Sequence, residues 1–313
     1  MTTTLLQKVQ QKAEDYQKVR FVKAQSAYYR TSFLQDDHFI WPEESYPLEK
    51  NRYLLIWLPA CPRAQRVAAT IDLLGLTDWI EKIELAPHRE KVWHFKERFE
   101  DAYYLDELFA EKKDAIQPCL YDKKRGEIVT NDQYNLSTLL LQFCRKLEKP
   151  TTRNLHPEEI KSQVDQMNGF IFKHVNVQIY RARNAKSPED KTEEEAKLVQ
   201  TFQLLDEHLA YYSFLLGVTL TDADLRLFAS LLRCPIYYKQ FALNCCQLNS
   251  YKNLWRYTQE IYKIPDIQKT AKLEQIVETH YRSPHNLEKF GSFYQNETVE
   301  STYGDFLEIK REY

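Results

Sequence analysis

A change of hydrophobic pattern constrains the fold of this chain more than any other feature of its sequence. Residues 54–58 form a continuous apolar run, bounded by charge on one side and by Pro59 on the other, as in a buried strand. Over residues 62–74 the apolar residues instead recur at helical spacing, and Gly75 is suited to end that helix. A buried strand that leads directly into a helix predicts an α/β unit.

The α/β pattern continues to about residue 149. Three further runs are typical of strands and cover residues 80–85, 116–121 and 127–130. The turn at 122–126 joins the last two runs as a hairpin. Asn131 and Asp132 are placed to cap a helix that ends near residue 147. We expect residues 86–114, which are polar and aromatic, to be a connection.

Beyond the predicted linker at residues 150–157, nearly the whole sequence has a helical period. A capping box at 192–195 predicts one helix start, and a second box at 221–224 predicts another, before a buried helix at 225–232. Residues 284–313 lack periodicity and are expected to drape over the surface. The predicted parts are an N-terminal extension (1–50), an α/β domain (51–149), an all-helical domain (157–283) and a C-terminal tail (284–313).

Charge and motifs exclude several classes of function. Lys and Arg total 43 and Asp and Glu total 45 in 313 residues, so the net charge of −2 gives no general attraction to nucleic acid. The 6 glycines form neither GxGxxG nor GxxxxGK followed by Ser or Thr, which excludes the glycine-rich nucleotide sites. Neither CxxC nor HExxH occurs, and we predict no metal site.

The sequence also predicts where the protein works. No apolar run approaches the length of a membrane span, and the first residues lack the basic and apolar regions of a secretory signal. We therefore expect a cytoplasmic protein with no membrane partner, whose six cysteines are mostly reduced thiols.

Cys61 lies between the first strand and its helix, where chemistry at sulfur is favoured. Pro62 suits the first helical position, which makes Cys61 the N-cap residue, near the unpaired amides of the first turn. Those amides and the helix dipole favour the thiolate, and Arg63 and Arg66 add positive charge. The alternative interpretation is a small buried thiol at a strand end. The other five cysteines occupy positions where a small apolar residue would serve, and we expect them in the core.

A peptide-binding site is predicted beside this thiol. If the Gln117–Pro118 bond is cis, the backbone of Gln117 becomes available to an extended peptide. Asp132 and Gln133, at the start of the following helix, could hold the charged end of that peptide. A small peptide with a thiol, an ammonium group and carboxylates fits this set, and glutathione is the candidate.

Five blocks carry a resemblance to a known family, and they lie at residues 51–66, 118–132, 171–182, 220–228 and 280–283. They include Ala60-Cys61-Pro62 and Leu220-Thr221-Asp222-Ala223-Asp224-Leu225-Arg226-Leu227-Phe228. In this order the blocks resemble the glutathionyl-hydroquinone reductases, the Xi-class, omega-like glutathione transferases. The resemblance implies a glutathione-transferase fold, with a thioredoxin-like glutathione-binding domain at 51–149, an all-helical C-terminal domain and a homodimer.

The resemblance implies a reaction and its residues. The Cys61 thiolate would attack the sulfur of a glutathionyl-hydroquinone, the quinol would leave, and a second glutathione would resolve the mixed disulfide. Tyr180 and Tyr281 would face the aromatic substrate and hydrogen-bond its phenolic oxygens. The implied contacts to glutathione come from Trp93, Gln117, Pro118, Asp132 and Gln133. Without the resemblance, Trp93 and both tyrosines are more simply ordinary half-buried aromatic residues.

The chain departs from the family pattern around the expected pocket. Its replacements are Arg63 for a tryptophan, Gln65 for a histidine, Gln117 for a valine and Gln133 for a serine. Two alternatives therefore stay open. The same thiol could act on other mixed disulfides of glutathione or of another small thiol, or the chain could be a non-catalytic module that binds a protein partner.

Overall fold

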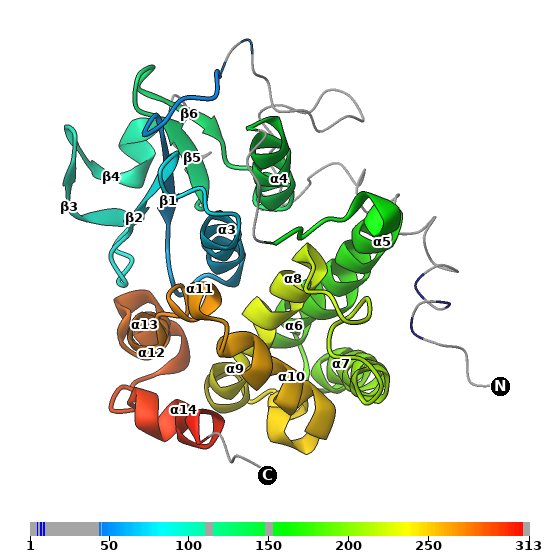
Figure 1. The fold of residues 1–313 in the computed structure, drawn as a ribbon. Helices are drawn as coiled ribbons and strands as arrows, with labels where there is room; N and C mark the ends of the chain where they lie inside the picture. The colour runs from blue at the N-terminus through cyan, green and yellow to red at the C-terminus, as the bar shows by residue number, and fades with distance from the viewer. Residues whose placement is uncertain are drawn as a thin grey trace. The chain divides into compact units, whose positions relative to one another are not determined.

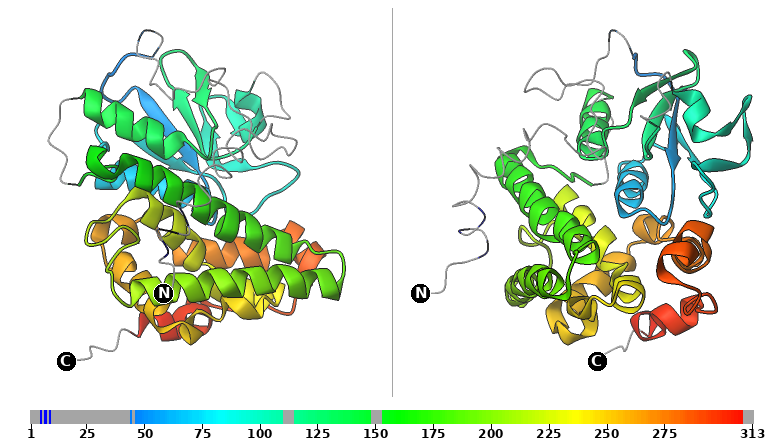
Figure 2. Two further views of the ribbon diagram at one scale, coloured as in Figure 1. Left: turned by 90° about the vertical axis from the view of Figure 1, so that its right-hand side faces the viewer. Right: turned by 180° about the vertical axis from the view of Figure 1, so that it is seen from behind.

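The computed structural model describes residues 5, 7, 9, 44, 46–109, 115–147 and 153–308 (Figures 1 and 2). Most of the predicted N-terminal extension, residues 1–50, therefore lies outside the described residues. The chain forms two compact units. Of the described residues, we call 44, 46–109, 115–147, 153–154 and 265–297 the sheet unit, and 5, 7, 9, 155–264 and 298–308 the helical unit.

The sheet unit is built on a four-stranded sheet in the order β2-β1-β5-β6. The strands are β1 (Tyr53–Trp57), β2 (Ile80–Glu84), β5 (Cys119–Asp122) and β6 (Glu127–Thr130). The pair β1–β2 is parallel and is joined through helix α3 (Pro62–Leu73), whereas β1–β5 and β5–β6 are antiparallel. All five residues of β1 are buried, which confirms the prediction from its continuous apolar run. Gly75, just past the helix, has the positive φ of 63° that favours glycine there.

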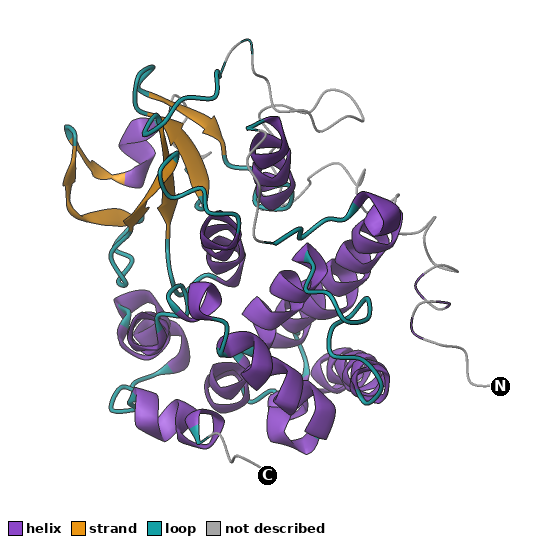
Figure 3. Ribbon diagram, viewed as in Figure 1, coloured by secondary structure: helices purple, strands orange, loops and turns teal. Residues whose placement is uncertain are grey.

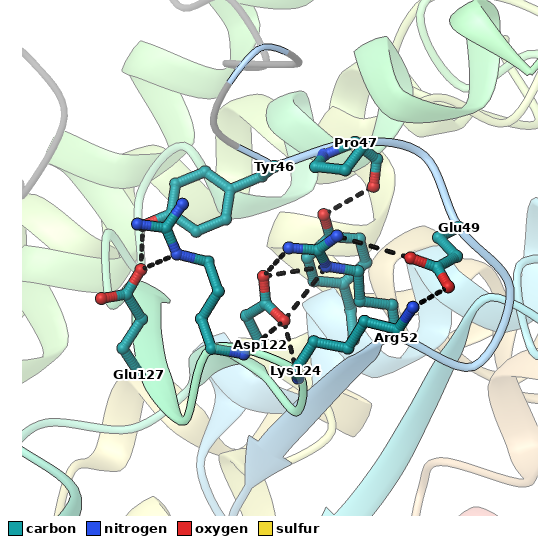
Figure 4. Close-up of polar contacts among 9 residues, drawn as sticks. Tyr46, Pro47, Glu49, Arg52, Asp122, Lys124 and Glu127 are labelled. Atoms are coloured by element: carbon teal, nitrogen blue, oxygen red, sulfur yellow. Dashed lines mark hydrogen bonds and ion pairs between the residues drawn. The ribbon is translucent and has the colours of Figure 1, made fainter.

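A buried ion pair joins the start of β1 to the end of β5 (Figure 4). Arg52 donates from Nε to Asp122 Oδ2 at 2.9 Å and from Nη2 to the same oxygen at 2.7 Å. The Asp122 carboxylate also accepts from the backbone N–H groups of Lys124 and Arg125 in the hairpin turn. One carboxylate therefore fixes both the β1–β5 register and the β5–β6 turn.

A second hairpin lies in the segment predicted to be only a connection, so that prediction was incomplete. It pairs β3 (His94–Phe99) with β4 (Ala102–Tyr104), antiparallel. Glu100 turns the chain with a φ of 51°, a conformation for which the usual sequence signal is glycine or asparagine. The hairpin lacks that signal, and several β3 side chains are exposed, which hides the apolar alternation.

Helix α4 (Leu136–Lys146) begins one turn later than predicted. Asp132 caps the turn before the helix instead, because its Oδ1 accepts from the backbone N–H groups of Tyr134 and Asn135 at 3.1 and 3.2 Å. The N-cap residue of the helix is Asn135. The polar residues at this corner were recognised correctly, but the helix start was misplaced.

Helices make up most of the described residues of the helical unit (Figure 3). A short π-helical turn lies at Phe172–Asn176. Its helices are α5 (Lys161–Ile171), α6 (Val177–Arg183), α7 (Pro188–Leu209), α8 (Asp222–Leu231), α9 (Cys234–Phe241), α10 (Lys252–Tyr262) and α14 (Val299–Leu307). The capping box at Thr221 and Asp224 is confirmed at the start of α8. The box predicted at 192–195 is wrong: Ser187 caps α7 and Pro188 follows it, so Thr192 lies inside the helix.

Helices at residues 265–283 agree with the predicted helical period, whereas the segment after residue 283 is more regular than the sequence indicated. Helices α11 (Pro265–Gln268), α12 (Leu273–Arg282) and α13 (Pro284–Phe290) belong to the sheet unit. Residues 284–313 were expected to drape over the surface, yet in the described part of this tail α14 buries Tyr303 and Phe306 and is capped by Thr298. A nine-residue helix contains too few turns to show a clear period, which explains the miss.

Candidate active site

Cys61 occupies the N-cap position of α3, as predicted. Its backbone is extended, with φ −81° and ψ 122°, and Pro62 is the first helical residue. The Cys61 N–H donates to the carbonyl of Leu58 at 3.0 Å, and the Cys61 carbonyl accepts from Gln65 N at 3.0 Å. The end of the buried strand therefore fixes the residue that starts the helix. Cys61 is buried, with 8% of its surface exposed.

Two arginines lie on the first turns of α3. Arg63 is half-buried, whereas Arg66 is 3% exposed. Arg66 donates from Nη1 to the carbonyl of Tyr134 at 3.2 Å, in the turn before α4. Its guanidinium group therefore links the helix that begins at Cys61 to the corner that contains Asp132 and Gln133.

The Gln117–Pro118 peptide bond is cis, as the hypothesis of a peptide site required. The buried Gln117 side chain accepts, through Oε1, from the N–H of Leu58 at 3.2 Å. Because Leu58 also accepts from Cys61, a short path of hydrogen bonds connects Gln117 to the cysteine.

Gln133 extends this path by one step. Its Nε2 donates to the carbonyl of Gln117 at 2.6 Å, so that carbonyl is already hydrogen-bonded within the chain. The other end of the amide, Oε1, is buried and has no hydrogen-bond partner among the described residues. A carbonyl acceptor fixes which end of the amide donates. Gln133 therefore presents a buried acceptor that a ligand N–H could fill, because an unpaired buried oxygen is costly.

Asp132 lies next to Gln133 and is 5% exposed. Its Oδ2 accepts from Asn135 Nδ2 at 2.7 Å, in addition to the two backbone bonds at Oδ1. The carboxylate is thus held rigidly by its own turn. A ligand ammonium group would approach a carboxylate that is oriented beforehand.

Trp93 is half-buried and precedes β3. Its carbonyl accepts from Leu105 N at 2.9 Å, and the Arg89 guanidinium carbon lies 5.8 Å from the centre of its ring. Arg89 was not predicted, because a cation–π contact of this kind leaves no pattern in the sequence.

The two tyrosines predicted for the aromatic substrate lie in different units. Tyr180 is half-buried on α6 of the helical unit, whereas Tyr281 is 1% exposed on α12 of the sheet unit. The ring of Tyr281 stacks on Tyr294, with 5.8 Å between ring centres and 30° between planes. Tyr294 was not recognised from the sequence, since it lies in a stretch without periodicity.

The described residues also bear on metal and membrane binding. In the ranges that the structure describes, no three or more His, Cys, Asp or Glu side chains are grouped so that they could hold a metal ion. In the same ranges, no helix has both the length and the apolar character that crossing a bilayer requires. All six cysteines are buried thiols that form no disulfide.

Known proteins resemble this chain over most of its length. It is 28% identical over 258 residues to glutathionyl-hydroquinone reductase YqjG of Escherichia coli, covering 78% of each protein. It is 27% identical over 251 residues to glutathionyl-hydroquinone reductase PcpF of Sphingobium chlorophenolicum, covering 76% of this chain and 80% of that protein. The family model of the glutathione S-transferase C-terminal domain matches residues 171–265.

Solved structures agree with these relatives. The glutathione-bound structure of Escherichia coli YqjG matches with a TM-score of 0.71 at 27% identity, covering 78% of this chain and 84% of that chain. The Xi glutathione S-transferase of Phanerochaete chrysosporium matches with a TM-score of 0.73 at 25% identity, covering 82% and 92%. The predicted glutathione-transferase fold, with a small-sheet N-terminal region and a mostly helical C-terminal part, is therefore confirmed. These relatives and structures support the predicted family, the enzymes named glutathionyl-hydroquinone reductases or Xi-class glutathione transferases.

Proposed function

We propose that the protein reduces glutathionyl-hydroquinones with glutathione through a mixed disulfide at Cys61. The Cys61 thiolate attacks the sulfur of the substrate thioether, and the carbon–sulfur bond breaks. The ring carbon takes a proton, so the quinol leaves reduced and glutathione stays on Cys61 as a disulfide. A second glutathione thiolate then attacks that disulfide, which releases glutathione disulfide and the Cys61 thiolate.

The position of Cys61 carries this proposal. An N-cap residue lies beside the amides of the first helical turn, and these amides with the helix dipole stabilise a negative charge. A single cysteine is sufficient for the reaction, because the second thiol comes from glutathione. This fits a sequence that lacks CxxC.

The residues around Cys61 would bind glutathione. The peptide part of glutathione would lie along the backbone at Gln117 and Pro118, with Trp93 packed against it. Its γ-glutamyl ammonium group would donate to Asp132 and to the buried Oε1 of Gln133. The glutathione-bound relative supports this choice of ligand.

Two tyrosines are assigned to contact the aromatic ring of the substrate. We propose that Tyr180 and Tyr281 donate hydrogen bonds to the phenolic oxygens of the quinol and so stabilise the charge that develops as the carbon–sulfur bond breaks. We also infer that the protein acts in the cytoplasm as a homodimer, as the family resemblance implies.

Replacing Gln133 with alanine is expected to weaken glutathione binding about tenfold, because one buried hydrogen-bond partner of the ligand is lost. The change also frees the Gln117 carbonyl from its bond to Nε2. Isothermal titration of the full-length protein with glutathione measures the effect. Gln268→Ala, an exposed change in the same unit, serves as the control and should leave the affinity unchanged. Equal affinities in both variants would contradict the assigned contact.

The thiol of Cys61 is expected to ionise below the ordinary cysteine pKa of about 8.5, because the helix N-terminus favours the thiolate. The measurement is the rate of alkylation at Cys61 as a function of pH, followed by peptide mass spectrometry. A pKa near the ordinary value would favour a non-catalytic binding module instead. Rates on a glutathionyl-hydroquinone and on a small glutathione mixed disulfide then separate the two enzymatic alternatives.

A further inference from the structure

A single carboxylate on α12 connects two segments that are far apart in the sequence. Glu278 Oε1 lies 2.7 Å from His88 Nε2, in the loop between β2 and β3. Glu278 Oε2 accepts from Arg282 Nη1 at 2.6 Å, one turn further along the same helix. All three side chains are partly buried, with between 31% and 40% of the side chain exposed. Each carboxylate oxygen therefore has its own cationic or hydrogen-bonding partner.

The contact between Glu278 and His88 holds the loop that contains Trp93. The next residue, Arg89, places its guanidinium carbon 5.8 Å from the centre of the Trp93 ring. At the base of the loop, Ala86 N donates to the carbonyl of His94 at 2.9 Å. Between this base and Trp93, the bond from His88 to Glu278 fixes the loop to a helix.

The contact between Glu278 and Arg282 holds the segment that follows α13. Arg282 donates from Nε to the carbonyl of Gln295 at 3.0 Å and from Nη2 to the carbonyl of Glu297 at 2.7 Å. Within this segment, Tyr294 stacks on Tyr281, the residue next to Arg282. Glu278 holds Arg282 in the orientation that these carbonyls require.

The charge of Glu278 suits this double role. Burial, the largest influence, raises its pKa, but the contacts with Arg282 and His88 together keep the pKa below its ordinary value. The carboxylate is therefore ionised at neutral pH and can accept on both oxygens. Hydrogen bonds to charged groups are stronger than neutral ones.

We infer that Glu278 is a positioning residue that fixes, through His88 and Arg282, the loop of Trp93 and the segment that stacks on Tyr281. These are the two aromatic residues assigned to glutathione and to the quinol ring. The inference rests on the proposed function for its consequence in catalysis, but the positioning itself can be tested without any substrate.

The first test is hydrogen exchange of the full-length protein without ligand, comparing Glu278→Ala with Glu274→Ala. Glu274 is exposed one turn earlier on α12 and has no hydrogen bond or ion pair described in the structure. We expect exchange at residues 86–93 and 291–297 to become about tenfold faster in Glu278→Ala only, since two hydrogen bonds to a charge are lost. Exchange in β1 should stay unchanged in both variants, which separates local loosening from general destabilisation.

Two single substitutions separate the contributions of His88 and Arg282 to the hydrogen-exchange effect. His88→Ala should loosen only residues 86–93, and Arg282→Ala should loosen only residues 291–297. If Glu278→Ala leaves either segment as protected as in the natural protein, or loosens β1 as well, the inference is overturned.

Kinetics provide the second test. In Glu278→Ala we expect the KM for a glutathionyl-hydroquinone to rise about tenfold because Trp93 is misplaced, and kcat to fall about threefold because Tyr281 loses its support, while Cys61 is untouched. A tenfold fall of kcat with an unchanged KM would contradict a positioning role. If the natural protein does not turn over this substrate at all, the proposed function fails, and the exchange result still decides whether Glu278 fixes both segments.

Discussion

Replacing Cys61 with serine is expected to lower kcat/KM for a glutathionyl-hydroquinone by at least about a thousandfold, because a serine hydroxyl stays protonated at neutral pH. Serine is close to cysteine in size and is a preferred N-cap residue, so α3 should form normally. The loss would therefore report on sulfur chemistry rather than on folding. Circular dichroism and glutathione titration should show an intact protein that still binds its ligand.

The matched control is Cys144→Ala on α4. Cys144 is 3% exposed and contacts the carbonyl of Leu74 through its sulfur, so its change affects packing and not the reaction. This variant should keep its rate within about twofold, since small core truncations act on stability. A Cys61→Ser protein as active as this control would reject Cys61 as the nucleophile.

Removing the carboxylate of Asp122 is expected to destabilise the protein by about 3–5 kcal/mol, the cost of breaking a buried ion pair, because Arg52 keeps only its partly exposed partner Glu49. The Asp122 side chain is fully buried and the Arg52 side chain is 10% exposed, so water cannot replace the lost partner. The backbone N–H groups of Lys124 and Arg125 also lose their acceptor. Urea unfolding of Asp122→Ala, compared with the natural protein, measures this loss.

A neighbouring carboxylate provides the control for that measurement. Glu49 contacts both Arg52 and Lys124 in the same cluster, but its side chain is 40% exposed (Figure 4). Glu49→Ala should therefore cost less than about 1 kcal/mol, as is typical of exposed ion pairs. If both variants lose the same stability, burial is not what makes the Asp122 pair important.

The centre of the sheet unit could be predicted because its sequence signals are local and agree with each other. The apolar run of β1 and the Cys61–Pro62 start of α3 occur within about twenty residues, and each fits only one structure well. The capping box at Thr221 and Asp224 is similarly complete in itself. The structure confirmed each of these predictions.

Other elements were missed because their stabilising contacts are not local. The β3–β4 turn relies on Glu100 at a positive φ, which no propensity scale favours. Helix α14 is stabilised by burying Tyr303 and Phe306, contacts that depend on chain segments distant in sequence. The start of α7 was misplaced because the acidic run at 193–195 resembles a helix start although it lies inside the helix.

The candidate site shows the same division. Cys61 was found from adjacent residues, whereas the cis bond before Pro118 was only a condition of the predicted peptide site and comes from the structure. The bond between Gln133 and the carbonyl of Gln117 joins residues 16 positions apart, so its donor and acceptor could not be paired from the sequence. The contact of Tyr294 with Tyr281 likewise depends on how the chain returns after α13.

A single-turnover experiment shows whether Cys61 takes the glutathionyl group from the substrate. The reduced full-length protein is mixed with an equimolar glutathionyl-hydroquinone and no free glutathione, and its peptides are then analysed by mass spectrometry. We expect each chain to release one free hydroquinone and to carry one glutathionyl group, removable by reductant, on Cys61. Hydroquinone release with an unmodified Cys61, or a glutathionyl group on another cysteine, would contradict this expectation.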